Sequence, residues 1–243
     1  MAGTLYLIPN ALGSEQLDAV IPAPVRELTA SLDCFIAENA KTARAFLKQV
    51  AQTHPLKTVM QEIRISELNV NTPAAEVAAL LAPLLEGKDV GLLSEAGVPA
   101  VADPGADLVR LAHQKGITVK PLVGPSSLLL ALMASGLNGQ SFAFHGYLPT
   151  DASERAARIR LLEQRSRQEK QTQILIETPY RNEAMLEALA THCSGNTLVC
   201  VATDLTLDSE SVVTKTASVW KQAIAGGKMP AFRKKPTVFL FLA

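Results

Sequence analysis

Residues 90–112 read VGLLSEAGVPAVADPGADLVRLA and hold a complete strand–loop–helix unit. The apolar run Val90–Leu93 is typical of a buried strand, and a loop rich in Gly and Pro follows it. Asp103 is predicted to cap the next helix through its carboxylate, with Pro104 at the first helical position. Such a junction leaves main-chain N–H groups free beyond the carboxyl end of a strand, which is where open α/β sheets bind ligands.

The rest of the chain alternates in a similar way, and its character changes near residue 122. We predict strands at 4–8, 34–37, 62–65 and 117–123 with helices at 42–52 and 73–84, then a charged helix at 153–170 and strands at 142–148, 173–177, 198–202 and 238–242. The second half therefore suggests a mixed, more antiparallel sheet. We expect an α/β protein of two domains, residues 1–122 and 123–243, each a sheet flanked by helices.

The composition excludes several classes of protein. Lys+Arg and Asp+Glu both number 23 in 243 residues, so no overall basic field attracts nucleic acid. The three cysteines, Cys34, Cys193 and Cys200, lack a CxxC spacing, so we predict neither a disulfide framework nor a zinc site, and expect a reducing, cytoplasmic compartment. We expect no signal peptide, because the first residues lack a basic region and a long apolar run, and no membrane span.

Most standard catalytic motifs are missing from the sequence. The four histidines are scattered and form no HExxH, so we expect no metal site. GxSxG, GxxxxGK[ST] and GxGxxG are also missing, which disfavours a triad hydrolase, a P-loop nucleotidase and a Rossmann dinucleotide site. What remains is three strand-to-helix junctions that contain proline, at 103–104, 124–125 and 178–179. Taken alone, each of these junctions is more typical of ordinary α/β architecture than of a functional site.

Four segments, taken in order, carry a family resemblance. They are GTLYLIPNALG (3–13), LLSEAGVPAVADPGADLVRLAHQKGI (92–117), PLVGPSSLLLALMASGL (121–137) and FAFHGYLP (142–149). They resemble the tetrapyrrole (corrin/porphyrin) methylase superfamily, and within it the 16S ribosomal RNA (cytidine-2′-O)-methyltransferase branch. The resemblance implies a two-domain class III methyltransferase fold, distinct from the Rossmann methyltransferases, with S-adenosylmethionine bound in a cleft between the domains.

The sequence departs from that branch at five motifs. TPIGN becomes IPNALG at 8–13, AEDTR becomes AENAK at 37–41, SDAG becomes SEAG at 94–97, ESPHR becomes ETPYR at 177–181, and ARELTK becomes ATDLTL at 202–207. Lys41 in place of arginine cannot make the same planar fork of hydrogen bonds. The segments assigned to the cofactor are thus better kept than those assigned to the substrate.

The resemblance also implies which residues hold the cofactor. Gly97 would let the chain approach the ligand closely, and Ser126 and Ser127 would either hold a carboxylate at a helix N-terminus or only cap their own helix. The predicted cofactor-binding residues are Pro9, Glu95, Ala96, Gly97, Val98, Pro99, Val101, Ser126, Ser127, Tyr180, Ala202 and Thr203.

A carboxylate is the expected general base for a ribose hydroxyl acceptor. Glu95 is the first candidate because its loop faces the predicted cofactor, and Glu38 and Glu177 are the others. Arg181 completes the predicted catalytic set, although it could instead pair with Glu177 or Glu38. Each of these acids could equally be a solvated or capping residue.

Three functions stay open at this stage. The first is a methyltransferase that acts on RNA of the small ribosomal subunit, with phosphate contacts from the basic residues at 155–170 and 233–235, or with those residues only solvated. The second is a methylase of a tetrapyrrole or another small metabolite. The third is a relative that binds the cofactor and has lost catalysis. The superfamily is commonly dimeric, so we expect a homodimer.

Overall fold

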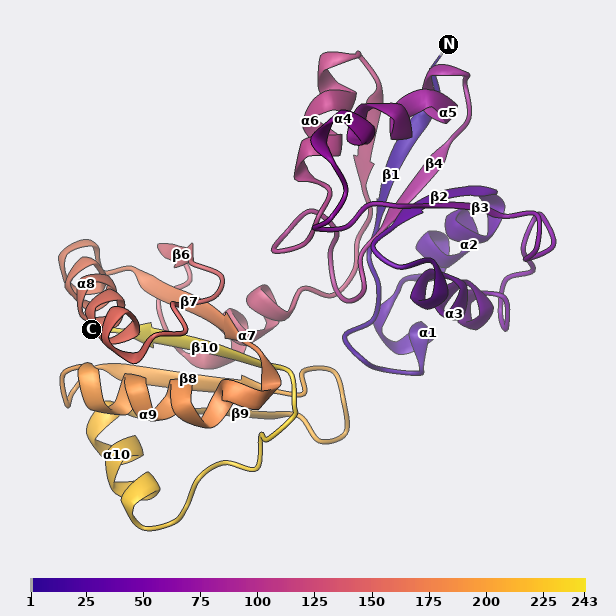
Figure 1. The fold of residues 1–243 in the computed structure, drawn as a ribbon. Coiled ribbons are helices and arrows are strands. Elements are labelled where there is room, and N and C mark those ends of the chain that lie inside the picture. Colours follow the sequence, from indigo (N-terminus) through magenta and orange to yellow (C-terminus); the bar gives the residue numbers. More distant parts are fainter. Residues whose placement is uncertain (1) are drawn as a thin grey trace. The chain divides into compact units, whose positions relative to one another are not determined.

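The computed structural model describes residues 2–243, which divide into two compact units, one up to residue 126 and one over residues 127–243 (Figure 1). The predicted boundary after residue 122 falls in the segment that joins the last strand of unit 1 to the first helix of unit 2. Each unit has its own sheet and its own core.

Unit 1 is built on a sheet of five parallel strands in the order β3-β2-β4-β1-β5. The strands are β1 (Thr4–Ile8), β2 (Cys34–Ala37), β3 (Arg64–Glu67), β4 (Val90–Leu93) and β5 (Thr118–Pro121). The central strands β2 and β4 are buried along their whole length, which is why their sequences CFIA and VGLL are continuously apolar.

Helices cover both faces of this sheet (Figure 1). One core holds α1 (Leu17–Val20), α2 (Ala23–Ser31) and α3 (Ala40–Val50); the other holds α4 (Ala74–Val77), the 3₁₀ turn η1 (Ala78–Leu81), α5 (Ala82–Leu85) and α6 (Ala106–Gln114). The helix predicted at 73–84 is therefore broken by a 3₁₀ turn, and Pro73 precedes it as the N-cap rather than starting it.

The strand order of unit 1 defines a topological switch point between the neighbouring strands β2 and β4. The connection from β2 leads to β3 at one edge of the sheet, whereas the connection from β4 leads past β1 to β5 at the other edge. The loops that follow β2 and β4 therefore diverge at the carboxyl edge of the sheet. In open α/β sheets, ligands bind in the crevice beyond such a point.

Unit 2 has a mixed sheet in the order β6-β7-β10-β8-β9, in which only β6 and β7 are parallel. Its strands are β6 (Phe142–Phe144), β7 (Thr172–Glu177), β8 (Leu198–Thr203), β9 (Ser211–Thr216) and β10 (Thr237–Leu242), and its helices are α7 (Ser127–Ser135), α8 (Ala152–Glu169), α9 (Asn182–His192) and α10 (Ala217–Ala225). The sequence reasoning missed β9 and α10, and predicted a longer strand over 142–148.

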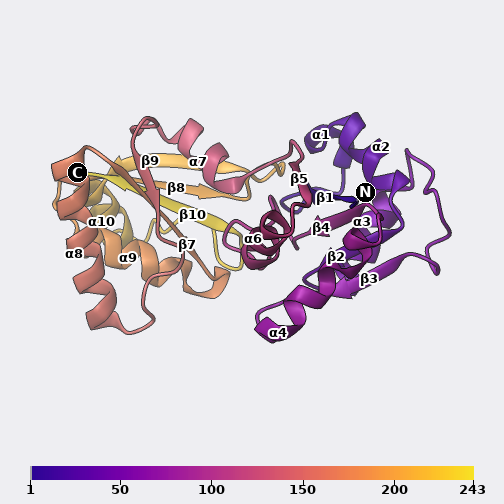
Figure 2. The same cartoon turned by 90° about the horizontal axis from the view of Figure 1, so that it is seen from above.

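The core of unit 2 lies between the sheet and α8, α9 and α10, whereas α7 lies on the other side of the sheet (Figure 2). The indole N–H of the buried Trp220 donates to the carbonyl oxygen of Val199 at 2.9 Å, so this large side chain leaves no unsatisfied donor. The rings of Phe232 and Phe239 meet edge to face at 6.2 Å between centroids. Among residues 2–243, no helix has both the length and the apolar character that crossing a bilayer requires.

Candidate active site

Asn10, just after β1, joins the loops that follow β1 and β4 at the carboxyl edge of the sheet in unit 1. Its backbone pairs with that of Gly97 in both directions, at 2.8 and 3.1 Å between nitrogen and oxygen. Its side-chain Nδ2 donates to the carbonyl oxygens of Ser94, at 3.2 Å, and Glu95, at 3.0 Å. Its Oδ1 accepts from the N–H of Ala11 at 2.8 Å. The side chain and the backbone of Asn10 together thus fix the start of the loop after β4.

That loop, residues 94–105, runs through an unusual backbone. Gly97 and Gly105 have φ of 70° and 132°, and two alanines, Ala100 and Ala102, lie in the left-handed region at 65° and 64°. Left-handed conformations cost free energy for residues that carry a Cβ, and they cluster at functional sites. The loop is therefore held by its surroundings in a shape that its own sequence disfavours.

The same loop presents main-chain donors. Within residues 2–243, the N–H groups of Ala96, Val98, Val101 and Ala102 donate no hydrogen bond to any protein acceptor, whereas the N–H of Gly97 is used by Asn10. Free N–H groups at the carboxyl edge of a parallel sheet are available to ligand acceptors or to water.

Gly97 and Gly124 let three loops come close together. A Cβ on Gly97 would lie 3.2 Å from Leu12 Cδ2 and 3.6 Å from the carbonyl oxygen of Pro125, and one on Gly124 would lie 2.2 Å from Pro9 Cγ. The loops after β1, β4 and β5 therefore approach at a distance that larger residues would prevent. Gly97 and Pro9, both predicted to bind the cofactor, thus lie in loops that contact one another, and their close neighbours here are protein atoms.

Three carboxylates gather at this edge, from Glu38 after β2, Glu95 after β4, and Asp103. Burial first, and then the charges of Glu38 and Glu95, raise the pKa of Asp103 to about 6. Burial and the charge of Glu95 also raise the pKa of Glu38, although the backbone N–H of Glu95 acts in the opposite direction. Glu95 itself is exposed and accepts a hydrogen bond from Thr42 Oγ1 at 3.1 Å. The cluster thus holds one half-buried carboxyl that titrates close to neutral pH.

Asp103 also lines an open cleft of about 410 Å³. The other walls are the segment after β3, including Leu68, Asn69 and Thr72, and the start of α6. The carboxyl is therefore reachable from solvent although it is half-buried.

The predicted capping role of Asp103 is wrong. Helix α6 begins at Ala106, its N-cap is Gly105, and no side chain caps it. The turn that Gly105 makes at φ 132° ends the loop later than the Asp103–Pro104 pair suggests. Sequence reasoning therefore treated Asp103 as a local structural residue, because nothing in the order of residues reveals that Glu38 lies beside it.

Glu177 and Arg181 form a closed pair in unit 2. The side chain of Glu177 is 1% exposed, and its Oε1 accepts from Arg181 Nη2 at 2.6 Å, Arg181 Nε at 3.0 Å and the N–H of Thr178 at 2.6 Å. The pairing of these two residues, one of the two alternatives left open by the sequence, is therefore present. A buried carboxylate that is already bonded in this way is poorly suited to accept a substrate proton.

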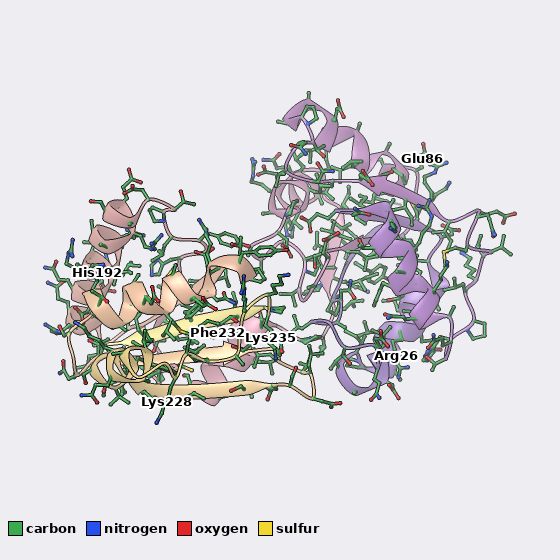
Figure 3. The ribbon with its side chains drawn as sticks, turned by 60° about the horizontal axis from the view of Figure 1, so that its bottom comes forward. Arg26, Glu86, His192, Lys228, Phe232 and Lys235 are labelled. Carbon is green, nitrogen blue, oxygen red and sulfur yellow. The ribbon has the colours of Figure 1, made fainter. Side chains whose placement is uncertain are left out.

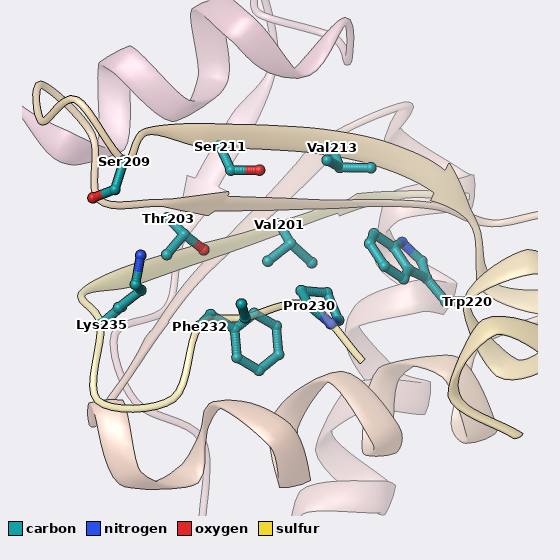
Figure 4. A pocket seen from close by; sticks show the side chains of 10 residues that line it. Val201, Thr203, Ser209, Ser211, Val213, Trp220, Pro230, Phe232 and Lys235 are labelled. Carbon is teal, nitrogen blue, oxygen red and sulfur yellow. The ribbon is translucent and has the colours of Figure 1, made fainter. Parts of the chain in front are cut away.

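The remaining predicted residues lie apart from the carboxylate cluster. Ser126 is the last residue of unit 1 and Ser127 the first of α7, while Ala202 and Thr203 are buried at the end of β8. Tyr180 is 79% exposed on the 3₁₀ turn η2 (Pro179–Arg181). Thr203 also lines a cavity of about 180 Å³, and Figure 4 shows Trp220 at one end of it and Lys235 at the other.

Comparisons with known proteins agree with this architecture. The profile of the tetrapyrrole (corrin/porphyrin) methylases matches residues 20–219. A protein of Xylella fastidiosa named ribosomal RNA small subunit methyltransferase I is 30% identical over 92% of this chain and 76% of its own length, and one of the same name from Synechocystis is 33% identical over 84% and 67%. This chain belongs to the tetrapyrrole methylase family. It is therefore an S-adenosylmethionine-dependent methyltransferase.

Solved structures show the same fold. A cobalt precorrin-4 methyltransferase superposes with a TM-score of 0.58 at 18% identity, covering 98% of this chain and 94% of the other. The methyltransferase CobJ superposes with a TM-score of 0.62 at 15% identity, covering 99% and 94%.

The chemistry of the carboxyl edge of unit 1 fits the cofactor of this family. S-adenosylmethionine carries two cationic groups, a sulfonium and an ammonium, together with acceptor atoms. The clustered carboxylates of Glu38, Glu95 and Asp103 suit cations, and the free N–H groups of loop 94–105 suit acceptors. Among residues 2–243, no three His, Cys, Asp or Glu side chains are arranged to hold a metal ion.

Replacing Asp103 by Asn is expected to stabilise the protein at pH 7–8. The raised pKa means that the folded state favours the neutral carboxyl, so its charge destabilises the fold above pH 6. We expect the D103N variant to gain on the order of 1–2 kcal/mol at pH 7–8, allowing for solvent screening, and almost nothing at pH 4, where the carboxyl of the wild type is largely neutral. Urea unfolding at both pH values measures this; an equal gain at pH 4 would contradict the electrostatic explanation.

Proposed function

We propose that this enzyme transfers a methyl group from S-adenosylmethionine to a ribose 2′-hydroxyl of the small ribosomal subunit RNA. The similarity to enzymes named ribosomal RNA small subunit methyltransferase I supports the substrate. The observation that carries the chemistry is the half-buried Asp103 carboxyl, flanked by Glu38 and Glu95 and open to a cleft.

Asp103 is the proposed general base of this reaction. The cofactor supplies an electrophilic methyl group on a cationic sulfur. When bound, the cofactor would supply its methyl group to the ribose oxygen and keep the electrons of the broken carbon–sulfur bond on sulfur, and the hydroxyl proton would pass to the Asp103 carboxylate. A base with a pKa near the working pH is efficient because it is both deprotonated and basic enough to accept the proton.

Glu38 and Glu95 support Asp103 in this proposal. Their charges raise its pKa and hence its basicity, and they attract the cationic donor. We keep Glu95, Ala96, Gly97 and Val98 as donor-binding residues, because the main chain of their loop is fixed by Asn10 and its free N–H groups can donate. The Glu177–Arg181 pair is assigned the role of positioning the 3₁₀ turn η2, which it closes.

Small ribosomal subunits from a strain that lacks the gene test the substrate. Purified enzyme with labelled donor is expected to label their RNA, and the labelled nucleotide should resist alkaline cleavage on its 3′ side because the 2′-oxygen is blocked. Subunits from the parent strain, which already carry the modification, are the control. Labelling of small metabolites in a cell extract, with none of the RNA, would contradict the proposal.

The pH dependence tests the base. We expect kcat/KM for the donor to rise with pH through about 6. In the D103N variant this acidic limb of the pH profile should disappear, and the rate should fall about 10²–10⁴-fold. The acidic limb of kcat should lie at lower pH than that of kcat/KM, because the bound cationic donor favours the carboxylate. The E177Q variant, matched in chemistry but remote in the chain, should keep the limb. A D103N variant with the wild-type profile would move the role of base to Glu38 or Glu95.

We infer a cytoplasmic homodimer. The three cysteines are free and buried, as in proteins of reducing compartments, and the proposed substrate is cytoplasmic. Helix α7 exposes Leu129 and Met133, apolar side chains that a second copy could cover. Sedimentation equilibrium of the purified protein is expected to give twice the 25.9 kDa mass of the chain, and a monomer mass at micromolar concentration would contradict the dimer.

A further inference from the structure

A basic segment of unit 2 is held in a fixed conformation against the turn that follows β7. The buried Asn182 donates from Nδ2 to the carbonyl oxygens of Phe232, at 3.0 Å, and Lys235, at 2.9 Å. The N–H of Lys234 donates to the carbonyl oxygen of Pro179 at 3.2 Å. Residues 232–235 and 179–182 are therefore neighbours, although some fifty positions separate them in the sequence.

The turn itself is equally well fixed, and it exposes an aromatic ring. The Glu177–Arg181 pair closes the 3₁₀ turn η2, and the N–H of Arg181 donates to the carbonyl oxygen of Thr178 at 2.9 Å. Tyr180 lies on this turn with 79% of its surface exposed. A large ring on a rigid turn loses little conformational freedom when a ligand packs against it.

Two cations of the adjoining segment 232–235 have no acidic partner. Lys235 is paired with Asp204 at 2.6 Å, and Arg181 with Glu177, so both are neutralised. Arg233 and Lys234 are exposed, and within residues 2–243 neither takes part in an ion pair. Lys234 also has a left-handed backbone, at φ 63°. The nearest acid along the chain from Tyr180, apart from Glu177, is the exposed Glu183 in the first turn of α9.

Helix α8 carries five arginines, but Arg155 is bonded to the carbonyl oxygens of Pro149 and Thr150, and Arg167 to Ser194 and Glu163. Its other exposed large side chain, Leu161, has no π-face for a base. At the Tyr180 turn, an exposed ring and cations without an acidic partner come from two segments that are bonded to each other.

We propose that Tyr180, Arg233 and Lys234 form a docking patch for an unpaired stretch of the RNA substrate. A base stacks on the Tyr180 ring while the two cations contact the flanking phosphates, which is the combination that single-stranded nucleic acids require. The Glu177–Arg181 pair and Asn182 hold the patch in place. This inference rests on the proposed function, and it assigns to Tyr180 a role different from the cofactor contact that the family resemblance implies.

The test compares RNA binding with donor binding in the full-length enzyme. A short fluorescein-labelled RNA without secondary structure and the unmethylated small subunits serve as RNA probes, and calorimetry with S-adenosylmethionine measures donor affinity. The variants are Y180L and Y180F at the ring, and K234N, in which asparagine tolerates the left-handed backbone while the charge is removed.

We expect Y180L to weaken RNA binding about 5-fold or more and Y180F to keep it, because phenylalanine retains the stacking face. K234N should weaken RNA binding, lower the slope of log affinity against log salt by about 0.7, and leave donor affinity unchanged. The matched control is K228N. Lys228 is an exposed lysine, and Figure 3 shows it apart from Phe232 and Lys235, so RNA affinity should not change.

The outcomes separate this inference from the proposed function. If Y180L and K234N bind and label the unmethylated subunits as well as the wild type does, the docking patch is wrong and the proposed function stands. Weaker donor binding in Y180L with unchanged RNA affinity would return Tyr180 to the cofactor site and also overturn the patch. Donor binding by the wild type with no binding of either RNA probe would overturn both.

Discussion

The hydrogen bonds of Asn10 are the constraint on which the site in unit 1 depends. They join the loops that follow the neighbouring strands β1 and β4, next to the switch point between β4 and β2. Without the pairing to Gly97 and the bonds to Ser94 and Glu95, loop 94–105 would have no fixed start, and the left-handed alanines within it would relax. The hydrogen bonds of Asn10, which follows the neighbouring strand β1, thus offset the backbone strain of the loop.

The same hydrogen bonds of Asn10 bring like charges together. They fix Glu95 beside Glu38 and near Asp103, so three acids share a partly buried region. Part of the repulsion between them appears as the raised pKa of Asp103. A fold optimised for stability alone would replace one of these acids by a neutral residue. Their retention is explained if a cationic ligand spends part of the catalytic cycle beside them, because its charge would offset their repulsion.

In unit 2, hydrogen bonds and ion pairs of the same kinds have a structural role. Its buried carboxylates are satisfied: Glu177 by Arg181, Asp204 by Lys235, and Glu163 by the N–H of Ser194 and the hydroxyl of Thr197. These contacts hold turns in place and leave little residual chemistry. Among residues 2–243, the clustered acids of unit 1 have no cationic partner and lie near free N–H groups, whereas unit 2 presents exposed cations and an exposed ring on a rigid frame. The first arrangement suits a small cationic donor, and the second suits a polyanion.

The sequence by itself determined the α/β architecture, the central strand–loop–helix unit and the family, because apolar runs, prolines and glycines act locally and keep their order along the chain. It offered the pair of Glu177 and Arg181 as one of two alternatives, and the structure shows this pair, because residues four apart on a turn lie close together. It missed β9 and α10, and it gave Asp103 a capping role. Only the tertiary structure decided that Asp103 lies beside Glu38, because parallel strands bring their carboxyl ends together through long crossovers, and burial and charge act through space rather than along the chain.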